Sequence, residues 1–400
     1  MKVIFASFQG INRRNAPQGM TKILLNVFKK CKIDSVVYYI GYDHGNLSDE
    51  RIKAVSRAHH FIVLAIIAYS KVFSLLFNKK PSYGPLRLFQ EKSFDYCLKF
   101  RLKQKCILVS SAAIPTSFKK NSLNGGINIF LPGNACERHI SDLLEEESKK
   151  YGVNLNDVYT YEKRIKFIEG SLEYVDELVT LTKVVYNSYR DYFPNLKSAC
   201  CEFHVEVDNY IHPKVGKDRK ELLTFCYVAH TVWLKGLYYL ITAFRQISQS
   251  RARLLIAGGL DNQTNLLINS ENLPENIVFC GSISNLNDLY SVSDVCIIPS
   301  IIDNHPTTIS ESLCSGTPVI TTNQCGSASL VMDYVNGFVV NPCDVESLVE
   351  KINWFLSNID KIDKMADSAM NSYKFLTNSN QNEKLAVLLE QKIRSYIISD

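Results

Sequence analysis

The sequence predicts an α/β protein with two doubly wound parallel-sheet domains that face each other across a cleft. Its 400 residues exceed what a single hydrophobic core usually organises. Short apolar runs of strand length alternate with segments of helical periodicity, which is typical of a parallel sheet covered by helices on both faces. The alternation stops at a polar, basic stretch, Ile211–Arg219, and then begins again.

These observations set the expected domain boundaries. We expect an N-terminal domain over residues 1–210, a linker over 211–220 and a C-terminal domain over 221–375. The amphipathic tail, residues 376–400, is expected to form a helix that packs back on the N-terminal domain. In such a pair of domains, a ligand is expected in the cleft, at the carboxyl ends of the strands.

Six short segments in the first half have the apolar or alternating pattern of strands. They are Val3–Ala6, Ser35–Ile40, Cys106–Ser110, Ile127–Leu131, Glu177–Leu181 and Glu202–Val207. Helices are expected at Met20–Lys30 and over residues 48–80, 139–150 and 156–175.

The most apolar stretch of the chain, Phe61–Phe77, has two open interpretations. Ser70 and Lys71 interrupt it, and it is shorter than the roughly 20 residues of a membrane span. It is either a buried helix or a helix at a membrane surface, with Lys71, Lys79 and Lys80 near lipid headgroups.

Charge and cysteine usage narrow the class of protein. A net charge of +5 is too small to indicate nucleic-acid binding, but it suits an anionic substrate or an anionic membrane. The twelve cysteines are scattered without zinc-ligand spacing, which favours a reducing cytosol. The opening run MKVIFASF is too short for a secretory signal. We expect a cytoplasmic protein, with the inner face of the cytoplasmic membrane as its place if the membrane interpretation holds.

The second half repeats the alternation. Strands are expected at Leu223–Ala229, Leu254–Ala257, Ile277–Cys280, Val295–Pro299, Val319–Thr322 and Gly337–Val340. Helices are expected at Lys235–Ile247, Leu286–Val292 and Thr307–Ser315, after an N-cap at Asp344, and at Glu383–Ile398.

The stretch Ser293–Pro318 combines a strand, a polar loop and the start of a helix. Gly316 and Pro318 are a usual helix stop. A helix that begins at the end of a strand directs unpaired backbone N–H groups and its positive dipole end at one point, which favours an anion. Two carboxylates, Asp303 and Glu311, lie eight positions apart in the loop and the helix.

Five segments of the second half resemble one enzyme family. They are KGLYYLITAF (Lys235–Phe244), LLIAGG (Leu254–Gly259), IVFCGSIS (Ile277–Ser284), Ile297–Gly326 and GFVVNPCDVESLVEKI (Gly337–Ile352). Together they resemble the retaining nucleotide-sugar glycosyltransferases of family four, which are GT-B enzymes with two Rossmann-like domains. The resemblance covers about 130 residues in order. It implies a donor-binding C-terminal domain and an acceptor-binding N-terminal domain.

The resemblance implies roles for particular residues. Glu311 matches the glutamate that accepts from the donor ribose, and one carboxylate can accept from two adjacent hydroxyls. Lys235 matches the lysine that contacts the diphosphate, and Asp303 takes the place of the acidic residue that reaches the donor sugar. The backbone amides of Thr307 and Thr308 fit the phosphate role. Other donor-binding candidates are His230, Gly258, Ser282, Ile283 and Pro306.

The chain also departs from the family pattern. His230 stands where family members often have an arginine, and a neutral histidine supplies less charge to a phosphate. Either phosphate binding is weaker, or Arg13 or Arg14 from the first domain closes onto the phosphate. Gly19 is the only glycine in the region where many members have a pair.

An N-domain histidine near the sugar is a further family feature. His139 is its nearest match by context, and Glu137 and Arg138 are comparable candidates. The alternative for a histidine at a helix start is a purely structural role.

The resemblance implies transfer with retention of the anomeric configuration and without a metal cofactor, and no D-x-D motif is present. A nucleotide-diphosphate sugar is the expected co-substrate. The expected acceptor is a lipid-linked or lipopolysaccharide saccharide of bacterial surface-polysaccharide synthesis. Two alternatives remain, a GT-B-like sugar-nucleotide epimerase and a degenerate sugar-nucleotide-binding protein. The carboxylates Asp303 and Glu311 argue against the epimerase.

Overall fold

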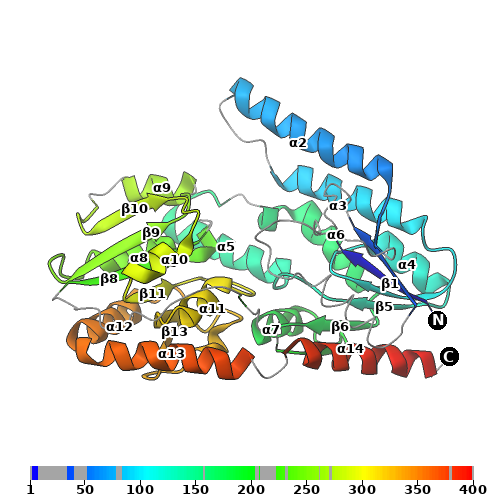
Figure 1. Ribbon diagram of the computed structural model, residues 1–400. Helices are drawn as coiled ribbons and strands as arrows, with labels where there is room; N and C mark the ends of the chain where they lie inside the picture. The colour runs from blue at the N-terminus through cyan, green and yellow to red at the C-terminus, as the bar shows by residue number, and fades with distance from the viewer. Residues whose placement is uncertain are drawn as a thin grey trace. The chain divides into compact units, whose positions relative to one another are not determined.

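The computed structural model describes residues 2–7, 34–39, 52–77, 83–155, 158–202, 207, 222–229, 233–260, 262–269, 273–377 and 381–398 (Figure 1). The chain divides into two compact units. Unit 1 comprises Met1–Phe203 with Asn382–Asp400, and unit 2 comprises His204–Gln381. The expected linker over 211–220 and the expected helix at Met20–Lys30 lie outside the described residues.

Unit 1 is built on a parallel sheet with the order β3-β2-β1-β4-β5-β6-β7. The strands are β1 (Lys2–Ser7), β2 (Ser35–Tyr39), β3 (Ile52–Ala54), β4 (Cys106–Ser110), β5 (Ile127–Phe130), β6 (Glu177–Thr180) and β7 (Ser198–Cys200). The strands form because their runs of β-branched and other apolar residues are covered on both faces, so that all five residues of β4 are buried. The sequence pattern does not indicate β7, and of the strand expected at Glu202–Val207 only the two end residues lie within the described part of the chain.

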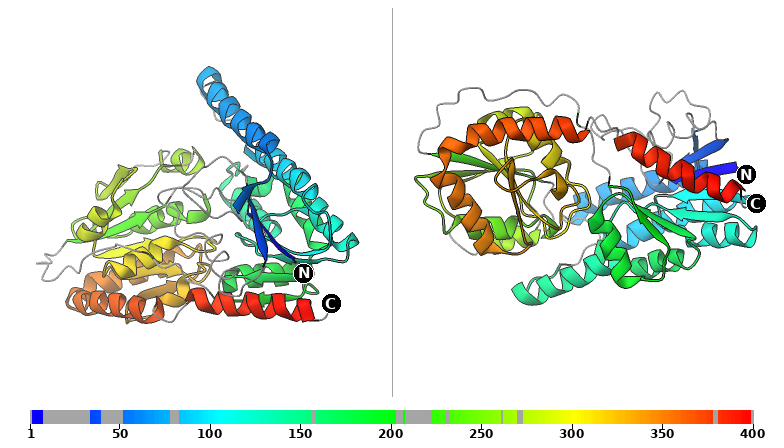
Figure 2. Two further views of the ribbon diagram at one scale, coloured as in Figure 1. Left: turned by 45° about the vertical axis from the view of Figure 1, so that its right-hand side comes forward. Right: turned by 90° about the horizontal axis from the view of Figure 1, so that it is seen from below.

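Helices connect the strands of unit 1. They are α2 (Arg57–Phe77), α3 (Tyr83–Lys99), α4 (Pro115–Leu123), α5 (Glu137–Tyr151), the 3-10 turn η1 (Val158–Thr160), α6 (Glu162–Leu172), α7 (Lys183–Tyr192) and α14 (Gln381–Ile398). The described part of residues 48–80 is mainly helical, as expected, except that Ile52–Ala54 pairs with β2 as an edge strand. The interpretation of Phe61–Phe77 as a buried helix is wrong. Only His59 and Val63 of α2 are buried, and the helix projects on the outer side of α3 (Figure 2).

The tail helix α14 lies in unit 1. The carboxylate of Glu177, at the start of β6, is almost fully buried and forms an ion pair with Lys392. It also accepts a hydrogen bond of 3.0 Å from the hydroxyl of Tyr396. A buried carboxylate needs such partners, so these contacts fix α14 against the edge of the unit 1 sheet (Figure 1).

Unit 2 has a parallel sheet with the order β10-β9-β8-β11-β12-β13. Its strands are β8 (Leu223–Val228), β9 (Ala252–Ala257), β10 (Ile277–Gly281), β11 (Val295–Ile298), β12 (Val319–Thr322) and β13 (Gly337–Val340). Its helices are η2 (Trp233–Lys235), α8 (Leu237–Phe244), α9 (Asn262–Asn269), α10 (Leu286–Val292), α11 (Thr307–Cys314), η3 (Ala328–Leu330), α12 (Val345–Ser357), η4 (Ile359–Lys361) and α13 (Ile362–Thr377). The predicted N-cap at Asp344 is confirmed, because its side chain accepts from the Ser347 amide at 2.9 Å.

Both sheets confirm the predicted Rossmann-like architecture, and they share one strand order. In each unit the first strand, β1 or β8, lies beside the fourth, β4 or β11, and the chain proceeds outward in opposite directions from this pair. Such a reversal leaves a crevice at the carboxyl ends of the two central strands, where open α/β sheets bind ligands. In unit 2 this position lies after β8 and β11.

Candidate active site

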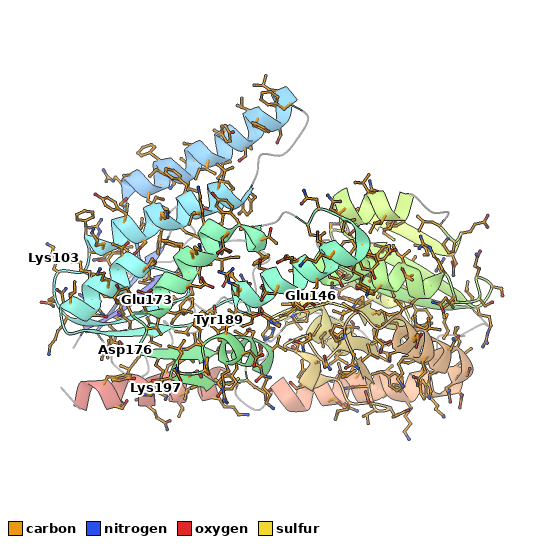
Figure 3. All side chains as sticks on the ribbon, turned by 180° about the vertical axis from the view of Figure 1, so that it is seen from behind. Lys103, Glu146, Glu173, Asp176, Tyr189 and Lys197 are labelled. Carbon is orange, nitrogen blue, oxygen red and sulfur yellow. The ribbon has the colours of Figure 1, made fainter. Side chains whose placement is uncertain are left out.

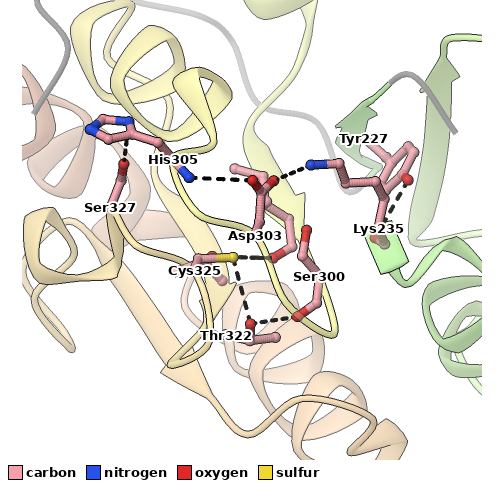
Figure 4. A network of polar contacts seen from close by, with 10 residues as sticks. Tyr227, Lys235, Ser300, Asp303, His305, Thr322, Cys325 and Ser327 are labelled. Atoms are coloured by element: carbon pink, nitrogen blue, oxygen red, sulfur yellow. Dashed lines mark hydrogen bonds and ion pairs between the residues drawn. The ribbon is translucent and has the colours of Figure 1, made fainter. Parts of the chain in front are cut away.

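Lys235 and Asp303 meet at the position where the strand order of unit 2 reverses. Lys235 lies in η2, which follows β8, and Asp303 lies in the loop that follows β11. The ammonium of Lys235 and the carboxylate of Asp303 form an ion pair (Figure 4). The two side chains are 29% and 13% exposed, so the pair is partly shielded but open to a ligand. The structure therefore joins two predicted site residues that lie far apart in the sequence.

Backbone hydrogen bonds hold the Asp303 loop, residues 299–306, in place. The amide of Asp303 donates to the carbonyl of Gln324 at 3.0 Å, and its carbonyl accepts from the Gly326 amide at 2.8 Å. The amide of Ile301 donates to the carbonyl of Leu234 at 2.8 Å, which ties the loop to the turn carrying Lys235. The ion pair is thus fixed from both sides.

Two glycines allow this close packing. A Cβ on Gly236 would lie 1.9 Å from the carbonyl oxygen of Pro299, and the backbone there has a φ of 70°. A Cβ on Gly258 would lie 1.8 Å from the carbonyl oxygen of Ala229, at a φ of 125°. Only glycine fits either position, because both the space and the backbone angle exclude a side chain. Packing alone therefore explains the glycine at position 258, whether or not it contacts a donor.

Glu311 lies in the second turn of α11, which begins directly after the Asp303 loop. Its side chain is buried and accepts a hydrogen bond from the hydroxyl of Tyr290 at 3.2 Å. Tyr290 itself is fully buried on α10. This contact fixes the orientation of the carboxylate. The sequence pattern does not predict it, because Tyr290 resembles any other apolar position of a packed helix.

The start of α11 has the features of an anion site. Pro306 precedes the helix and offers no side chain that could cap it. The first amides of a helix, here those of Thr307 and Thr308, have no acceptor within the helix itself. Together with the positive end of the helix dipole they favour an anion at this point.

Sequence reasoning missed His305 and Cys325. The His305 amide donates to the carboxylate of Asp303 at 3.4 Å, and its ring nitrogen Nδ1 lies 3.2 Å from the hydroxyl of Ser327 (Figure 4). Burial, and to a smaller extent the charge of Asp303, raises the pKa of the Cys325 thiol and keeps it neutral. The position of His305, two residues after Asp303, is a signal that could have identified it.

Ser282 and Ile283 follow β10, whose carboxyl end lies on the same edge of the sheet. Gly281 ends the strand with a φ of 65°, and its carbonyl accepts from the amide of Gly258 at 2.8 Å. Ser282 is exposed, and Ile283 packs against the unit 2 core. The structure places both beside the Gly258 turn, and their predicted contact with a base stays a prediction.

The candidates in unit 1 have contacts of their own. Arg138 is held by Glu162 and Glu169 of α6, at 2.8 and 2.9 Å, which is a structural role between two helices. The ring of His139 packs edge-on against Tyr192, and burial lowers the pKa of His139 and so keeps the ring neutral.

Glu137 lies in a buried charge cluster. Its carboxylate is 3.7 Å from the guanidinium of Arg164, which also binds Glu91 at 3.0 Å. Burial raises the pKa of Glu137 to about 7, although the charge of Arg164 acts in the opposite direction. A second guanidinium, that of Arg87, binds Glu91 at 2.8 Å, so two guanidiniums and two carboxylates make up this cluster. His230, Arg13, Arg14 and Gly19 lie outside the described residues. Within the described ranges, no group of three or more His, Cys, Asp or Glu side chains is arranged to hold a metal ion.

Comparison with known proteins identifies the domain that holds the ion pair. Residues 209–372 match the family model of "Glycosyl transferases group 1". Most of unit 2 is thus similar to the glycosyl transferases group 1 family. The chain is 30% identical over 149 residues to the uncharacterized glycosyltransferase MJ1607 of Methanocaldococcus jannaschii. The matched segment makes up 36% of this chain and 37% of that protein. It is 25% identical over 158 residues to the capsular polysaccharide biosynthesis glycosyltransferase CapM of Staphylococcus aureus. That match makes up 38% of this chain and 41% of CapM. The chain thus spans well under two thirds of the length of these two curated relatives.

Solved structures show that the likeness in fold extends over both units. WaaG, a glycosyltransferase involved in lipopolysaccharide biosynthesis, matches with a TM-score of 0.63 at 14% identity, over 96% of this chain and 99% of its own. Anabaena Alr3699/HepE in complex with UDP matches with a TM-score of 0.58 at 12% identity, over the full length of both chains. The fold is that of GT-B glycosyltransferases.

Proposed function

We propose that this protein is a glycosyltransferase that moves a sugar from a nucleotide-diphosphate sugar to a hydroxyl of a saccharide acceptor. The observation that carries the proposal is the ion pair between Lys235 and Asp303, fixed where the strand order reverses inside the region similar to the glycosyl transferases group 1 family. The diphosphate becomes the leaving group, and negative charge develops on it in the transition state. A fixed cation and helix amides stabilise that charge.

The residues around this ion pair and at the start of α11 have distinct roles in this proposal. The ammonium of Lys235 has three donors, so it can keep Asp303 while it binds a phosphate oxygen. Asp303 either holds a hydroxyl of the donor sugar or stabilises the positive charge that forms on the sugar ring. Glu311, oriented by Tyr290, accepts from the ribose hydroxyls. The amides of Thr307 and Thr308 bind phosphate.

The finer part of the proposal is retention of the anomeric configuration without a metal cofactor. Lys235 and the α11 amides supply the positive charge that a metal ion supplies elsewhere. Same-face attack by the acceptor hydroxyl, with the leaving phosphate as its base, gives retention. An NMR time course of the product anomer tests this step, and an inverted product would refute it.

The proposed acceptor is a lipid-linked or lipopolysaccharide saccharide of bacterial surface-polysaccharide synthesis, met at the inner face of the cytoplasmic membrane. Support comes from CapM and WaaG, whose names refer to capsular polysaccharide and lipopolysaccharide, and from the exposed apolar helix α2. Neither the epimerase nor the degenerate binding protein is favoured by these observations.

A thermal-shift screen with UDP-, GDP- and ADP-sugars tests the proposed donor class, because a ligand that binds only the folded protein raises its melting temperature. We expect one base series to stabilise the protein, followed by slow release of free nucleoside diphosphate. Stabilisation by none of the three series would contradict the proposal.

A further inference from the structure

Helix α2 exposes apolar side chains on most of its surface. Leu75, Leu76 and Phe77 are consecutive and are 84%, 71% and 60% exposed. Consecutive helical residues point about 100° apart, so these three exposed side chains face three different directions around the α2 tip. Of the described helices, α2 alone is long and apolar enough to cross a membrane by length and composition. A helix that is apolar all round is stable only when something apolar surrounds it.

The polar groups of α2 suit a nonpolar environment. Ser70 donates its hydroxyl to the carbonyl of Ile66 at 2.8 Å, and Ser74 donates to the carbonyl of Ser70 at 2.8 Å. Both hydroxyls are therefore satisfied within the helix, as they must be in lipid. Lys71, the one charged residue between Phe61 and Phe77, has a side chain long enough to reach a headgroup.

The charges around α2 are complementary to an anionic surface. Helix α2 contains no acidic residue. The two acidic residues of α3, Glu91 and Asp95, are buried and bind Arg164 and the start of α4. The exposed charged side chains of α2 and α3 are basic. They are continued by Arg101, Lys103 and Lys105 at the end of α3, where Figure 3 places Lys103 far from the tip of α2.

Aromatic side chains form a stripe along α3. Phe89 and Tyr96 are seven residues apart, which puts them on one face of α3. The ring of Phe100, one residue beyond the helix, lies 5.0 Å from that of Tyr96, and all three side chains are more than half exposed. The ammonium of Lys99 lies 5.3 Å from the ring of Tyr96 and 5.6 Å from that of Phe100. Aromatic rings next to lysines are typical of the headgroup level of a membrane.

Chain connectivity sets how deep α2 can go. A span would carry Phe77 across a hydrocarbon layer of about 30 Å. Only six peptide units join Phe77 to Tyr83, and they reach at most about 22 Å. Gly84 packs against Tyr161 of unit 1, so α3 stays with the unit and holds the end of α2 on the same side of the bilayer.

We propose that α2 lies in one leaflet of an anionic bilayer with its apolar side chains among the acyl chains. Lys71 and the two lysines that follow Phe77 in the sequence then reach the headgroups, where the aromatic stripe and lysines of α3 also lie. A second copy of the chain is a poorer occupant, because two such surfaces would bring only positive charges together. This inference rests on the membrane association in the proposed function and names the segment, the lipid charge and the depth.

The test compares two pairs of leucines in the full-length protein. Leu75→Glu/Leu76→Glu alters the tip of α2, and Leu123→Glu/Leu266→Glu is the matched control at sites that are 78% and 64% exposed elsewhere. In flotation assays, the wild type and the control should bind vesicles of phosphatidylcholine with phosphatidylglycerol, and bind phosphatidylcholine alone more weakly. The tip variant should partition at least about a hundredfold less, because two leucines no longer enter lipid.

Depth is measured with Leu75→Trp and, as its control, Leu123→Trp. Lipids brominated at mid-chain should quench the tryptophan at 75 and leave the one at 123 unquenched. Equal flotation of the tip variant and the wild type, no flotation of the wild type, or quenching at neither position would overturn the inference. So would a wild-type dimer that the tip variant abolishes without any vesicle binding.

Nucleotide binding by the same variants separates this inference from the proposed function. The tip variant should keep the thermal shift produced by the nucleotide sugar, since α2 lies in unit 1 and the donor residues lie in unit 2. If the wild type does not float with vesicles but still binds nucleotide, only the inference about the membrane is refuted. If the wild type floats with vesicles but binds no nucleotide, only the proposed function is refuted.

Discussion

The helices that follow the fourth strand of each sheet, α4 in unit 1 and α11 in unit 2, begin in opposite ways. The first amides of α4 are already bound, because the carboxylate of Asp95 accepts from Thr116 and Ser117 at 2.8 Å each. Helix α11 begins at Pro306, which has no capping side chain. The same fold thus fills one anion position with its own carboxylate and has no capping side chain at the equivalent one.

The charged side chains of the two units differ in the same way. In unit 1, the carboxylates of Glu91 and Glu137 lie against the guanidinium of Arg164 inside the unit. In unit 2, Lys235 and Asp303 form a pair that remains partly exposed at the end of the sheet. Buried charge in unit 1 is therefore structural, and the exposed pair in unit 2 is the place where we expect chemistry.

The largest effect is expected from Lys235→Met. Removal of the fixed cation takes away stabilisation of the developing phosphate charge, which is worth roughly 100- to 1,000-fold in kcat. Release of nucleoside diphosphate from the donor sugar measures it. Lys364→Met, at an exposed position on α13, is the matched control and should leave the rate unchanged. Equal rates for the two variants would remove Lys235 from the site.

Glu311→Gln should weaken nucleotide affinity by about 10- to 150-fold, the equivalent of one charged hydrogen bond of 1.5–3 kcal/mol. Calorimetric titration measures the loss. Tyr290→Phe removes the hydroxyl that donates to Glu311 and orients it, so we expect a smaller loss. Glu346→Gln, at an exposed site on α12, serves as the control. Unchanged affinity in Glu311→Gln would exclude the ribose role.

Asp95→Ala should destabilise unit 1 by about 1–3 kcal/mol, because the part-buried amide of Thr116 and the buried amide of Ser117 lose their acceptor. Asp95→Asn keeps one acceptor oxygen and should cost less. Denaturant unfolding measures both, and nucleotide affinity should not change in either variant. If Asp95→Ala weakened nucleotide binding while stability stayed the same, the structural role of this carboxylate would be refuted.

The smallest effect concerns pH. The pKa of Glu137 is about 7 in the folded protein and near 4.5 in the unfolded chain. Between these values the folded state keeps a proton that the unfolded state has lost, so stability should fall as pH rises from about 4.5 to 7. In Glu137→Gln the free energy of unfolding, measured by denaturant unfolding, should fall by about 1–3 kcal/mol less over this pH range. Glu145→Gln, at an exposed site, should keep the wild-type pH profile. An identical pH profile in wild type and Glu137→Gln would contradict the assignment.

The sequence predicts the strands of unit 2 and the position of the Asp303 loop well, because buried apolar runs with sharp ends leave few alternatives. It does not predict β3, since Ile52–Ala54 is too short to show a period. It also cannot show that Lys235 and Asp303 touch, because their contact depends on strand order rather than on spacing. The exposure of α2 is hidden for another reason, since an apolar helix has the same sequence whether protein or lipid covers it.

The start of α11 provides the most direct test of the account. Pro306→Asp should fill the anion position as Asp95 fills that of α4, whereas Pro306→Ala should leave it open. Calorimetric titration with UDP, GDP and ADP should show that the wild type and Pro306→Ala bind the same nucleotide with similar affinity. Pro306→Asp should bind it at least about tenfold more weakly while remaining folded. Equal affinity in all three proteins, or no binding of any nucleotide by the wild type, would contradict the account.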